Sequence, residues 1–307
     1  MEDWIRALRE LIVEELKRSK FPLPADRSIC SKWMEGMAEG GRRILYTSCM
    51  YQLAPLIDKA VDLLRAMGAS SGGARARLAA VGAKAFGRLV LRPDEERLRW
   101  AEGVLKNIAA MLKRAGVEFG VLRDEPYSGA LLYELGFERD FAEYAKSVYA
   151  YFKEKGVEEV ITVDPHTYHV LSQIYPKYVD GFDLKVYSYM DFVKPAGARI
   201  RGRVVVHDSC LYARYLGKYE AYRRLLDEAG VERAEDPYVT GRAYSGCCGG
   251  PIESVRPDVS AEVAKLRVQQ LAKLSEVVVT ECPICYVNLS KAGRGVVKVY
   301  DLAEVLA

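Results

Sequence analysis

Residues 202–212 read GRVVVHDSCLY, and residues 42–51 read RRILYTSCMY. Both segments have a basic lead, a run of β-favouring residues and then Ser-Cys-apolar-Tyr. A second pair of segments is also similar. Both have a β-favouring run followed by x-Pro-x-x-Tyr, and they read VEEVITVDPHTYHVL at 157–171 and LSEVVVTECPICYVNL at 274–289. LRDEP at 122–126 also aligns with CCGGP at 247–251, proline on proline. Similar segments that recur in the same order along a chain indicate an internal duplication.

Around these repeats, short β-rich runs alternate with helical segments, which is typical of α/β proteins. We predict two tandem, pseudo-symmetric α/β modules, each with a small, mainly parallel sheet flanked by helices. The expected strands are Arg43–Tyr46, Glu118–Leu122, Glu159–Val163, Lys185–Ser188, Arg203–His207, Glu276–Thr280 and Val296–Tyr300. The expected helices are 54–67, 95–115, 138–155, 167–175, 219–229, 258–274 and 286–292.

The predicted division of the chain has three parts. Residues 1–41 form an amphipathic helix over 1–19 and an extended segment, because Pro22 and Pro24 favour extended backbone. The first module covers 42–201 and has an insertion near 69–104 that begins with the Gly-rich SSGGARAR stretch. The second module covers 202–307.

Composition excludes several classes of protein. Half of the 307 residues are hydrophobic and 28% are charged, as in a globular protein with a proper core. No run approaches the ~18 apolar residues that a membrane span needs. The net charge is +3 with the signs interspersed, so nucleic acid is not an expected partner. Acidic residues within the first twenty positions argue against a signal peptide, so we expect a cytoplasmic protein that meets a membrane only through a partner subunit.

The seven cysteines carry the chemical signal, and five of them fall in the last hundred residues. With an odd number and no export signal, a disulfide framework is not expected. Each of the five follows a β-run or lies in a Gly-rich turn, so they can converge at the carboxyl edge of a parallel sheet. Thiolates select iron–sulfur clusters or zinc. Zinc on four thiols, a metal-free dithiol and buried free cysteines remain as alternatives to an iron–sulfur cluster. The five are Cys210, Cys247, Cys248, Cys282 and Cys285.

This arrangement, Cys210, then Cys247-Cys248-Gly249, then Cys282-Pro283-Ile284-Cys285, resembles the CCG or cysteine-rich domain. That domain occurs in the catalytic subunit of heterodisulfide reductase and in related iron–sulfur subunits of lactate, glycolate and glycerol-3-phosphate oxidising complexes. The resemblance implies one [4Fe–4S] cluster of non-cubane type per chain, held by the five thiolates. The first module resembles a copy that has lost most of its cysteines, keeping Leu122-Arg123 and Asp164-Pro-His-Thr167 at the matching places.

The resemblance also implies an oxidoreductase. We expect an iron–sulfur subunit of heterodisulfide-reductase type that exchanges electrons with a small thiol or disulfide substrate. An electron-relay subunit of a hydroxy-acid or glycerol-3-phosphate oxidising complex that feeds quinone is one alternative, and a zinc-stabilised scaffold for a redox partner is another. The chain lacks the CxxCxxCxxxCP runs of ferredoxins, so a separate ferredoxin-like or flavoprotein subunit is the expected partner.

Other positions are weaker candidates. Cys49 matches Cys210 and is either a buried small side chain or a redox thiol, whereas Cys30 has only a structural reading. His166 is a candidate proton donor. Arg123 and Asp164 either line a polar substrate pocket or belong to a surface that was rebuilt where a cluster was lost. Cys49, Asp164 and His166 together are a weaker zinc candidate. His207 is a candidate to hydrogen-bond near a cluster sulfur.

Overall fold

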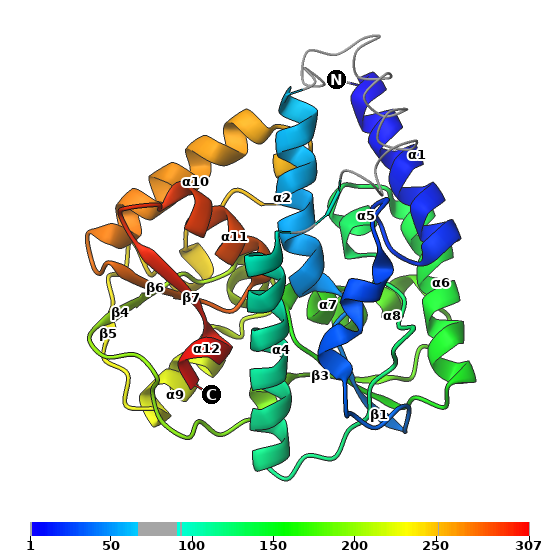
Figure 1. The fold of residues 1–307 in the computed structure, drawn as a ribbon, viewed down its shortest axis with the longest axis horizontal. Helices are drawn as coiled ribbons and strands as arrows, with labels where there is room; N and C mark the ends of the chain where they lie inside the picture. Colours follow the sequence, from blue (N-terminus) through cyan, green and yellow to red (C-terminus); the bar gives the residue numbers. More distant parts are fainter. Residues whose placement is uncertain (1, 67–90, 93, 251, 307) are drawn as a thin grey trace.

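The protein contains two all-parallel sheets in a computed structural model that describes residues 2–66, 91–92, 94–250 and 252–306 (Figure 1). The first sheet has the order β1-β2-β3 and the second the order β5-β4-β6-β7. This confirms the predicted α/β class with two parallel sheets flanked by helices. The strands are β1 (Arg43–Tyr46), β2 (Glu159–Thr162), β3 (Lys185–Ser188), β4 (Val204–Val206), β5 (Arg233–Ala234), β6 (Val277–Thr280) and β7 (Lys298–Asp301).

The two sheets repeat one topology. The sequence repeat pairs β1 with β4 and β2 with β6, and β3 and β7 then occupy the same edge of their sheets. The predicted strand Glu118–Leu122 is not a strand in the structure, which has only two isolated bridges there, Ile44 to Gly120 and Glu39 to Val121. The chain changes its pairing partner within two residues, so no ladder forms. The bridge to Ile44 nevertheless places this segment beside β1, as β5 lies beside β4.

Helices cover both sheets, and most of them match the predicted ranges. The helix expected at 54–67 begins earlier, at Met50. The helix expected at 286–292 begins at Pro283, because proline is well tolerated in the first helical turn. The helix expected at 167–175 is split by a π-helical turn at Val170–Ile174. Within the described ranges, no helix is long and apolar enough to cross a membrane. The helices are α1 (Glu2–Ser19), α2 (Met50–Ala66), α4 (Glu95–Arg114), α5 (Ala130–Glu134), α6 (Glu138–Glu154), α7 (Pro165–His169), α8 (Tyr175–Tyr178), α9 (Tyr219–Glu228), α10 (Pro257–Ala272), α11 (Pro283–Ala292) and α12 (Leu302–Leu306).

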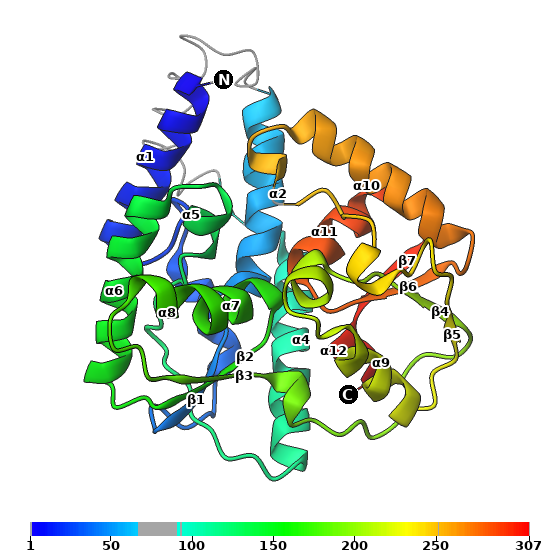
Figure 2. The ribbon, with the colours of Figure 1, turned by 180° about the vertical axis from the view of Figure 1, so that it is seen from behind.

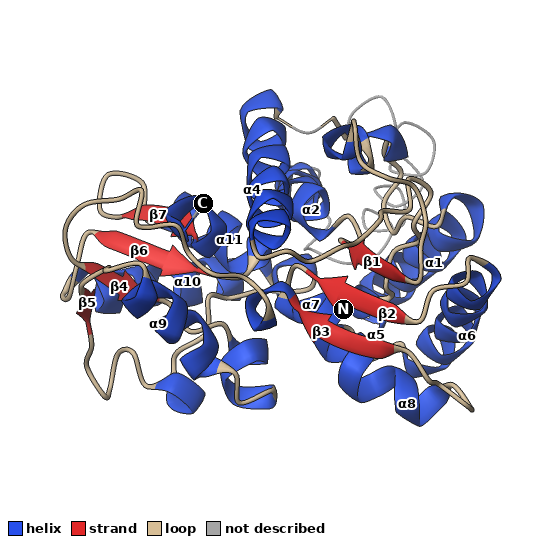
Figure 3. Ribbon diagram, turned by 90° about the horizontal axis from the view of Figure 1, so that it is seen from below, coloured by secondary structure: helices blue, strands red, loops and turns tan. Residues whose placement is uncertain are grey.

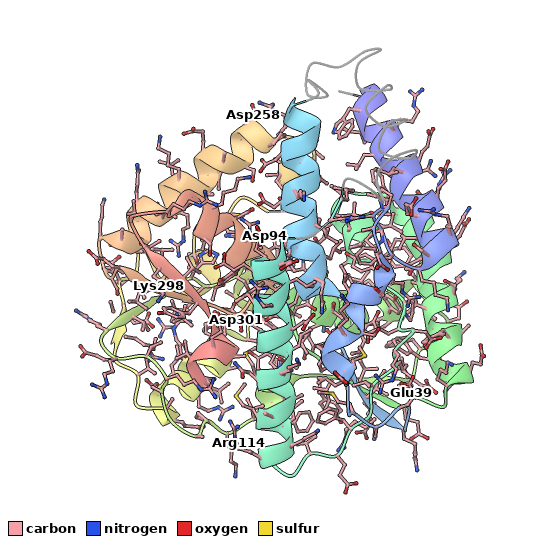
Figure 4. The ribbon with its side chains drawn as sticks, in the orientation of Figure 1. Glu39, Asp94, Arg114, Asp258, Lys298 and Asp301 are labelled. Carbon is pink, nitrogen blue, oxygen red and sulfur yellow. A yellow bond between two sulfur atoms is a disulfide. The ribbon has the colours of Figure 1, made fainter. Side chains whose placement is uncertain are left out.

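The carboxyl ends of the two sheets face each other across the middle of the molecule (Figure 3). Tyr51, in the first turn of α2 after β1, donates a hydrogen bond to Asp301 at the end of β7, over 2.8 Å. The matching Tyr212, after β4, lies 3.1 Å from the hydroxyl of Ser188 at the end of β3. Each module therefore places its repeated tyrosine on the last strand of the other. Figure 4 shows Asp301 at this junction beside α4.

Helix α4 holds the two modules together (Figures 1 and 2). Its Trp100 ring stacks on Tyr286 of α11 with centroids 3.8 Å apart, and its indole N–H donates to Glu304 of α12 over 3.0 Å. Asn107 adds a hydrogen bond to the carbonyl of Ala303. The insertion predicted near 69–104 falls mostly outside the described residues, and its described end is the start of α4.

A disulfide joins Cys30 to Cys49, 19 residues apart. This differs from the expectation that the chain would form none. Cys30 lies at the end of a short 3-10 turn, Arg27–Cys30, in the segment between α1 and β1, and Cys49 directly precedes α2. Both side chains are buried in the apolar core. The bond anchors the N-terminal segment to the place where the second module carries Cys210.

Glu125 is a buried carboxylic acid close to this bond, only 3% exposed. The amide of Thr47 donates to it over 3.2 Å. Burial raises the pKa of Glu125 to about 7, against the opposing hydrogen bonds from Thr47 and the charge of Arg27. The folded protein therefore holds this proton at a pH where the unfolded chain has lost it.

We expect that property to make Glu125→Gln visible in the pH dependence of stability. Below pH ~4.5 both folded and unfolded wild type are protonated, and the stabilisation from the raised pKa is complete. Between pH ~4.5 and ~7 the wild type should lose up to about 1.4 kcal/mol of unfolding free energy per pH unit relative to the variant. Urea unfolding of both proteins at several pH values checks this, and a difference that does not change with pH would contradict it.

Candidate functional site

The five cysteines of the second module come together at the carboxyl edge of its sheet. Cys210 lies in the loop after β4, and Cys282 and Cys285 begin α11 after β6. Cys247 and Cys248 lie in the Gly-rich loop that follows a 3-10 turn at Arg242–Tyr244. Cys210 and Cys247 are partly exposed, whereas the other three are buried. The site thus has a closed side and a side that reaches the surface.

Contacts between the sulfur atoms link all five into one set. The sulfur atoms of Cys248 and Cys285 lie within 4.8 Å of each other. Cys247 shifts the pKa of Cys210 and of Cys248, and Cys282 shifts the pKa of Cys285, so each thiol of the five has another as a neighbour. Hydrogen bonding from Cys210 lowers the pKa of Cys247. Burial acts to raise the pKa of Cys282, but the contacts of this thiol with Cys285 and His166 outweigh burial and lower its pKa to about 5. Hydrogen bonding to neighbouring thiols raises the pKa of Cys210, Cys248 and Cys285. Five thiolates placed so close together would repel one another, and metal ions among them would compensate that charge.

Two glycines let the loop around the cysteine pair approach the helices. A Cβ on Gly249 would lie 2.5 Å from the carbonyl oxygen of Ser260 on α10, and one on Gly250 would lie 2.3 Å from Ile284 on α11. Gly249 also has φ +95°, where side chains are strained, and its amide donates to the sulfur of Cys247 over 3.3 Å.

We expect Gly249→Ala to distort the cysteine loop. Backbone strain and the clash with Ser260 should lower stability by roughly 2 kcal/mol or more and reduce the amount of bound metal. Gly246→Ala is the matched control, because a Cβ there would meet only side-chain atoms, the nearest at 3.3 Å. Thermal unfolding and metal analysis of both variants test this, and equal behaviour of the two would contradict it.

The first module contributes a histidine to this site. The Nε2 atom of His166 lies 3.4 Å from the sulfur of Cys282, and its Nδ1 atom lies 2.6 Å from Glu134 at the end of α5. Burial disfavours a charged ring, but Glu134 and Cys282 outweigh it and raise the pKa of His166 well above its usual value. Asp164 caps α7 by accepting from the amide of Thr167, and burial raises its pKa to about 6. A cation from one module therefore faces a cysteine of the other.

A second histidine lies on the opposite, second-module side. His207 follows β4 and groups with Cys248 and Cys285, with one potential ligand atom of each residue within 4.8 Å of the others. The guanidinium of Arg267 donates to its Nδ1 atom over 3.1 Å. Burial, with the charge of Arg267, lowers the pKa of His207 to about 3, so the ring is neutral.

The remaining sequence candidates lie elsewhere. Cys49 is bonded to Cys30 and so is not a free thiol, which leaves no ligand from it for the zinc set considered with Asp164 and His166. Arg123 donates to the carbonyls of Met34 and Met37 and pairs with Glu39 over 3.0 Å. Figure 4 shows Glu39 at the outer edge of the first sheet, away from Asp301 at the junction. Arg123 is thus held in the surface of the first module.

Sequence reasoning missed two residues of the site, Glu134 and Arg267. Glu134 lies in the stretch DEPYSGALLYELG at 124–136, which resembles the cysteine-poor copy of the family, but nothing in it singles out Glu134. Arg267 lies in no such stretch. One sequence signal could have identified Arg267. It is the only charged residue on the face of α10 that is otherwise made of small and apolar side chains.

The donor set corresponds to a known family. Residues 204–290 match the family model described as the cysteine-rich domain. This segment is similar to the cysteine-rich domain over 87 of the 307 residues. The family resemblance predicted from the cysteine spacing is thereby confirmed. All five cysteines lie within the matched residues, so the cysteine-rich domain contains the whole sulfur set.

Similarity to characterised chains extends beyond the cysteine-rich domain. The chain is 30% identical over 219 residues to "Probable iron-sulfur-binding oxidoreductase FadF" of Bacillus subtilis, which covers 66% of this chain and 30% of that protein. It is 31% identical over 223 residues to "Probable membrane-anchored ferredoxin" of Chromohalobacter salexigens, covering 66% and 33%. It is 29% identical over 241 residues to "EtfAB:quinone oxidoreductase" of Syntrophomonas wolfei, covering 69% and 32%. The chain spans about a third of the length of these relatives.

Proposed function

We propose that this chain is an iron–sulfur oxidoreductase subunit that relays electrons through one cluster. The observation that carries the proposal is the linked set of five thiols, Cys210, Cys247, Cys248, Cys282 and Cys285, at one sheet edge. Zinc is satisfied by four ligands, so it would leave one of these thiols without a metal bond. The donor set suits a [4Fe–4S] cluster, which supplies a one-electron centre when bound.

The chain's own residues support such a centre in three ways. Apolar packing excludes water from Cys248, Cys282 and Cys285. Partly exposed Cys210 and Cys247 give the centre a side at which a partner can approach. His166 supplies a hydrogen-bonding group from the first module to Cys282.

Among the functions in this class, relay toward quinone has the better support. The names of the similar proteins include a quinone oxidoreductase and a membrane-anchored ferredoxin. Heterodisulfide cleavage delivers two electrons to its substrate, and the described part of the first module retains no free cysteine for a second cluster. We propose a ferredoxin-like or flavoprotein subunit as the electron partner, and membrane association through such a subunit.

The deciding measurement is the content of iron, acid-labile sulfide and zinc in anaerobically purified protein, with an EPR spectrum after mild oxidation. About four irons and four sulfides per chain with an oxidised-state signal are expected. About one zinc per chain without sulfide would overturn the proposal and favour the structural scaffold.

A second experiment separates quinone relay from disulfide reduction. The dithionite-reduced protein is mixed with a water-soluble quinone or with an asymmetric disulfide, and the cluster absorbance is followed. We expect fast reoxidation by the quinone, with two chains consumed per quinone reduced. Fast reoxidation by the disulfide alone would instead support the heterodisulfide-reductase type.

A further inference from the structure

Arg267 is a buried cation without a carboxylate partner. It lies on α10 with 2% of its surface exposed. Its Nε donates to His207, its Nη1 to the carbonyl of Val239 and to Gln270, and its Nη2 to the hydroxyl of Ser245, all within 2.7–3.1 Å. Every one of these acceptors is neutral. Throughout the described part of the chain, no carboxylate forms an ion pair with this guanidinium. A buried, uncompensated charge is costly, so a nearby anion is expected.

The acidic groups around Arg267 do not supply that anion. Asp208 is the carboxylate that most favours the charged form of Arg267, but both its oxygens bind the guanidinium of Arg223, the second oxygen over 3.0 Å. Arg267 donates to His207, and a ring nitrogen of His207 lies within 4.8 Å of the sulfurs of Cys248 and Cys285. The charges of Cys285, Cys248 and Cys247 also favour the charged form of Arg267. The positive charge therefore lies next to the sulfur set.

The contact with His207 also determines where that ring carries its hydrogen. Because Nδ1 accepts from Arg267, a neutral ring has its hydrogen on Nε2. The Nε2 atom is buried and has no hydrogen-bond partner in the protein. One ring nitrogen of His207 lies within 4.8 Å of the sulfurs of Cys248 and Cys285, so the ring that carries this unpartnered N–H is next to the sulfur set.

We propose that Arg267 is the counter-charge of the anionic cluster and orients His207 to donate its Nε2–H to a cluster sulfur. This inference rests on the proposed function. A fixed cation and an N–H donor beside the cluster stabilise the form that carries one more electron, so they raise its reduction potential. They also favour retention of the cluster, because they offset the repulsion among its ligands.

The test compares two substitutions of opposite character in the full chain. Arg267→Gln keeps a polar side chain but removes the charge, whereas Arg267→Lys keeps the charge but makes fewer hydrogen bonds. For R267Q we expect cluster loss to a chelator to be about tenfold faster and the reduction potential to be more negative. For R267K we expect both properties to lie between those of R267Q and wild type. In the cluster-free proteins, R267Q should lose less thermal stability than it does with the cluster bound.

The outcomes are distinct. A potential of R267Q equal to that of wild type, or equal effects of R267Q and R267K, would show that Arg267 is only a hydrogen-bonding hub and would overturn the inference. An equal loss of melting temperature with and without the cluster would do the same. If wild type binds zinc without sulfide, the proposed function itself fails, and this is seen before any variant is made.

Discussion

Replacing Cys285 by serine should remove the metal centre and with it much of the stability of the second module. Cys285 is buried in the first turn of α11 and contacts both Cys248 and Cys282, so it links the CxxC turn to the Gly-rich loop. A serine hydroxyl is a poor replacement for a soft thiolate. Iron should fall from about four per chain to less than about one. Because metal binding and folding are linked, the melting temperature should drop by roughly 10 °C or more.

The matched control for C285S is the double variant Cys30→Ser/Cys49→Ser. It removes two buried cysteines that lie outside the linked sulfur set, so its iron content should equal that of wild type. Iron analysis and thermal unfolding of anaerobically prepared proteins measure both effects. Retention of iron by C285S would show that the ligand assignment is wrong, and loss of iron from the double variant would mean that the modules share one site.

The same double variant should be clearly less stable than wild type under oxidising conditions. The disulfide closes a loop of 19 residues between the N-terminal segment and the start of α2. In the chain-entropy model a loop of this size contributes about 3 kcal/mol by restricting the unfolded chain. For a chain of this size that corresponds to a fall in melting temperature of roughly 5–12 °C.

A reducing agent provides the internal control for this second prediction. Reduction of the wild type should lower its unfolding midpoint to that of Cys30→Ser/Cys49→Ser, whereas the variant should not respond. The midpoint is measured by urea unfolding with and without a phosphine reductant. If the reductant leaves the unfolding midpoint of the wild type unchanged, the disulfide does not stabilise the fold.

Much of the architecture follows from local patterns in the chain. The runs RILY at 43–46 and VVV at 204–206 are continuously β-favouring and are buried strands of parallel sheets. Their repetition with Ser-Cys-apolar-Tyr predicted two modules of one topology, which the strand orders of the two sheets repeat. The segment 118–122 shows the limit of such patterns, because a β-favouring run becomes a strand only where a neighbouring chain stays in register.

The cysteine spacing by itself carried the resemblance to the cysteine-rich domain and named the five candidate ligands, because thiols at the strand ends of a parallel sheet can converge on one centre. Only the tertiary structure decided what surrounds them. His166, which also contacts Glu134, reaches Cys282 from the other module, and Arg267 on α10 donates to His207 beside the sulfur set. It also decided that Cys30 pairs with Cys49, since spacing alone does not define a pairing. The physical reason is that burial and charge compensation depend on how elements distant in sequence pack, and a local pattern carries no information about those distances.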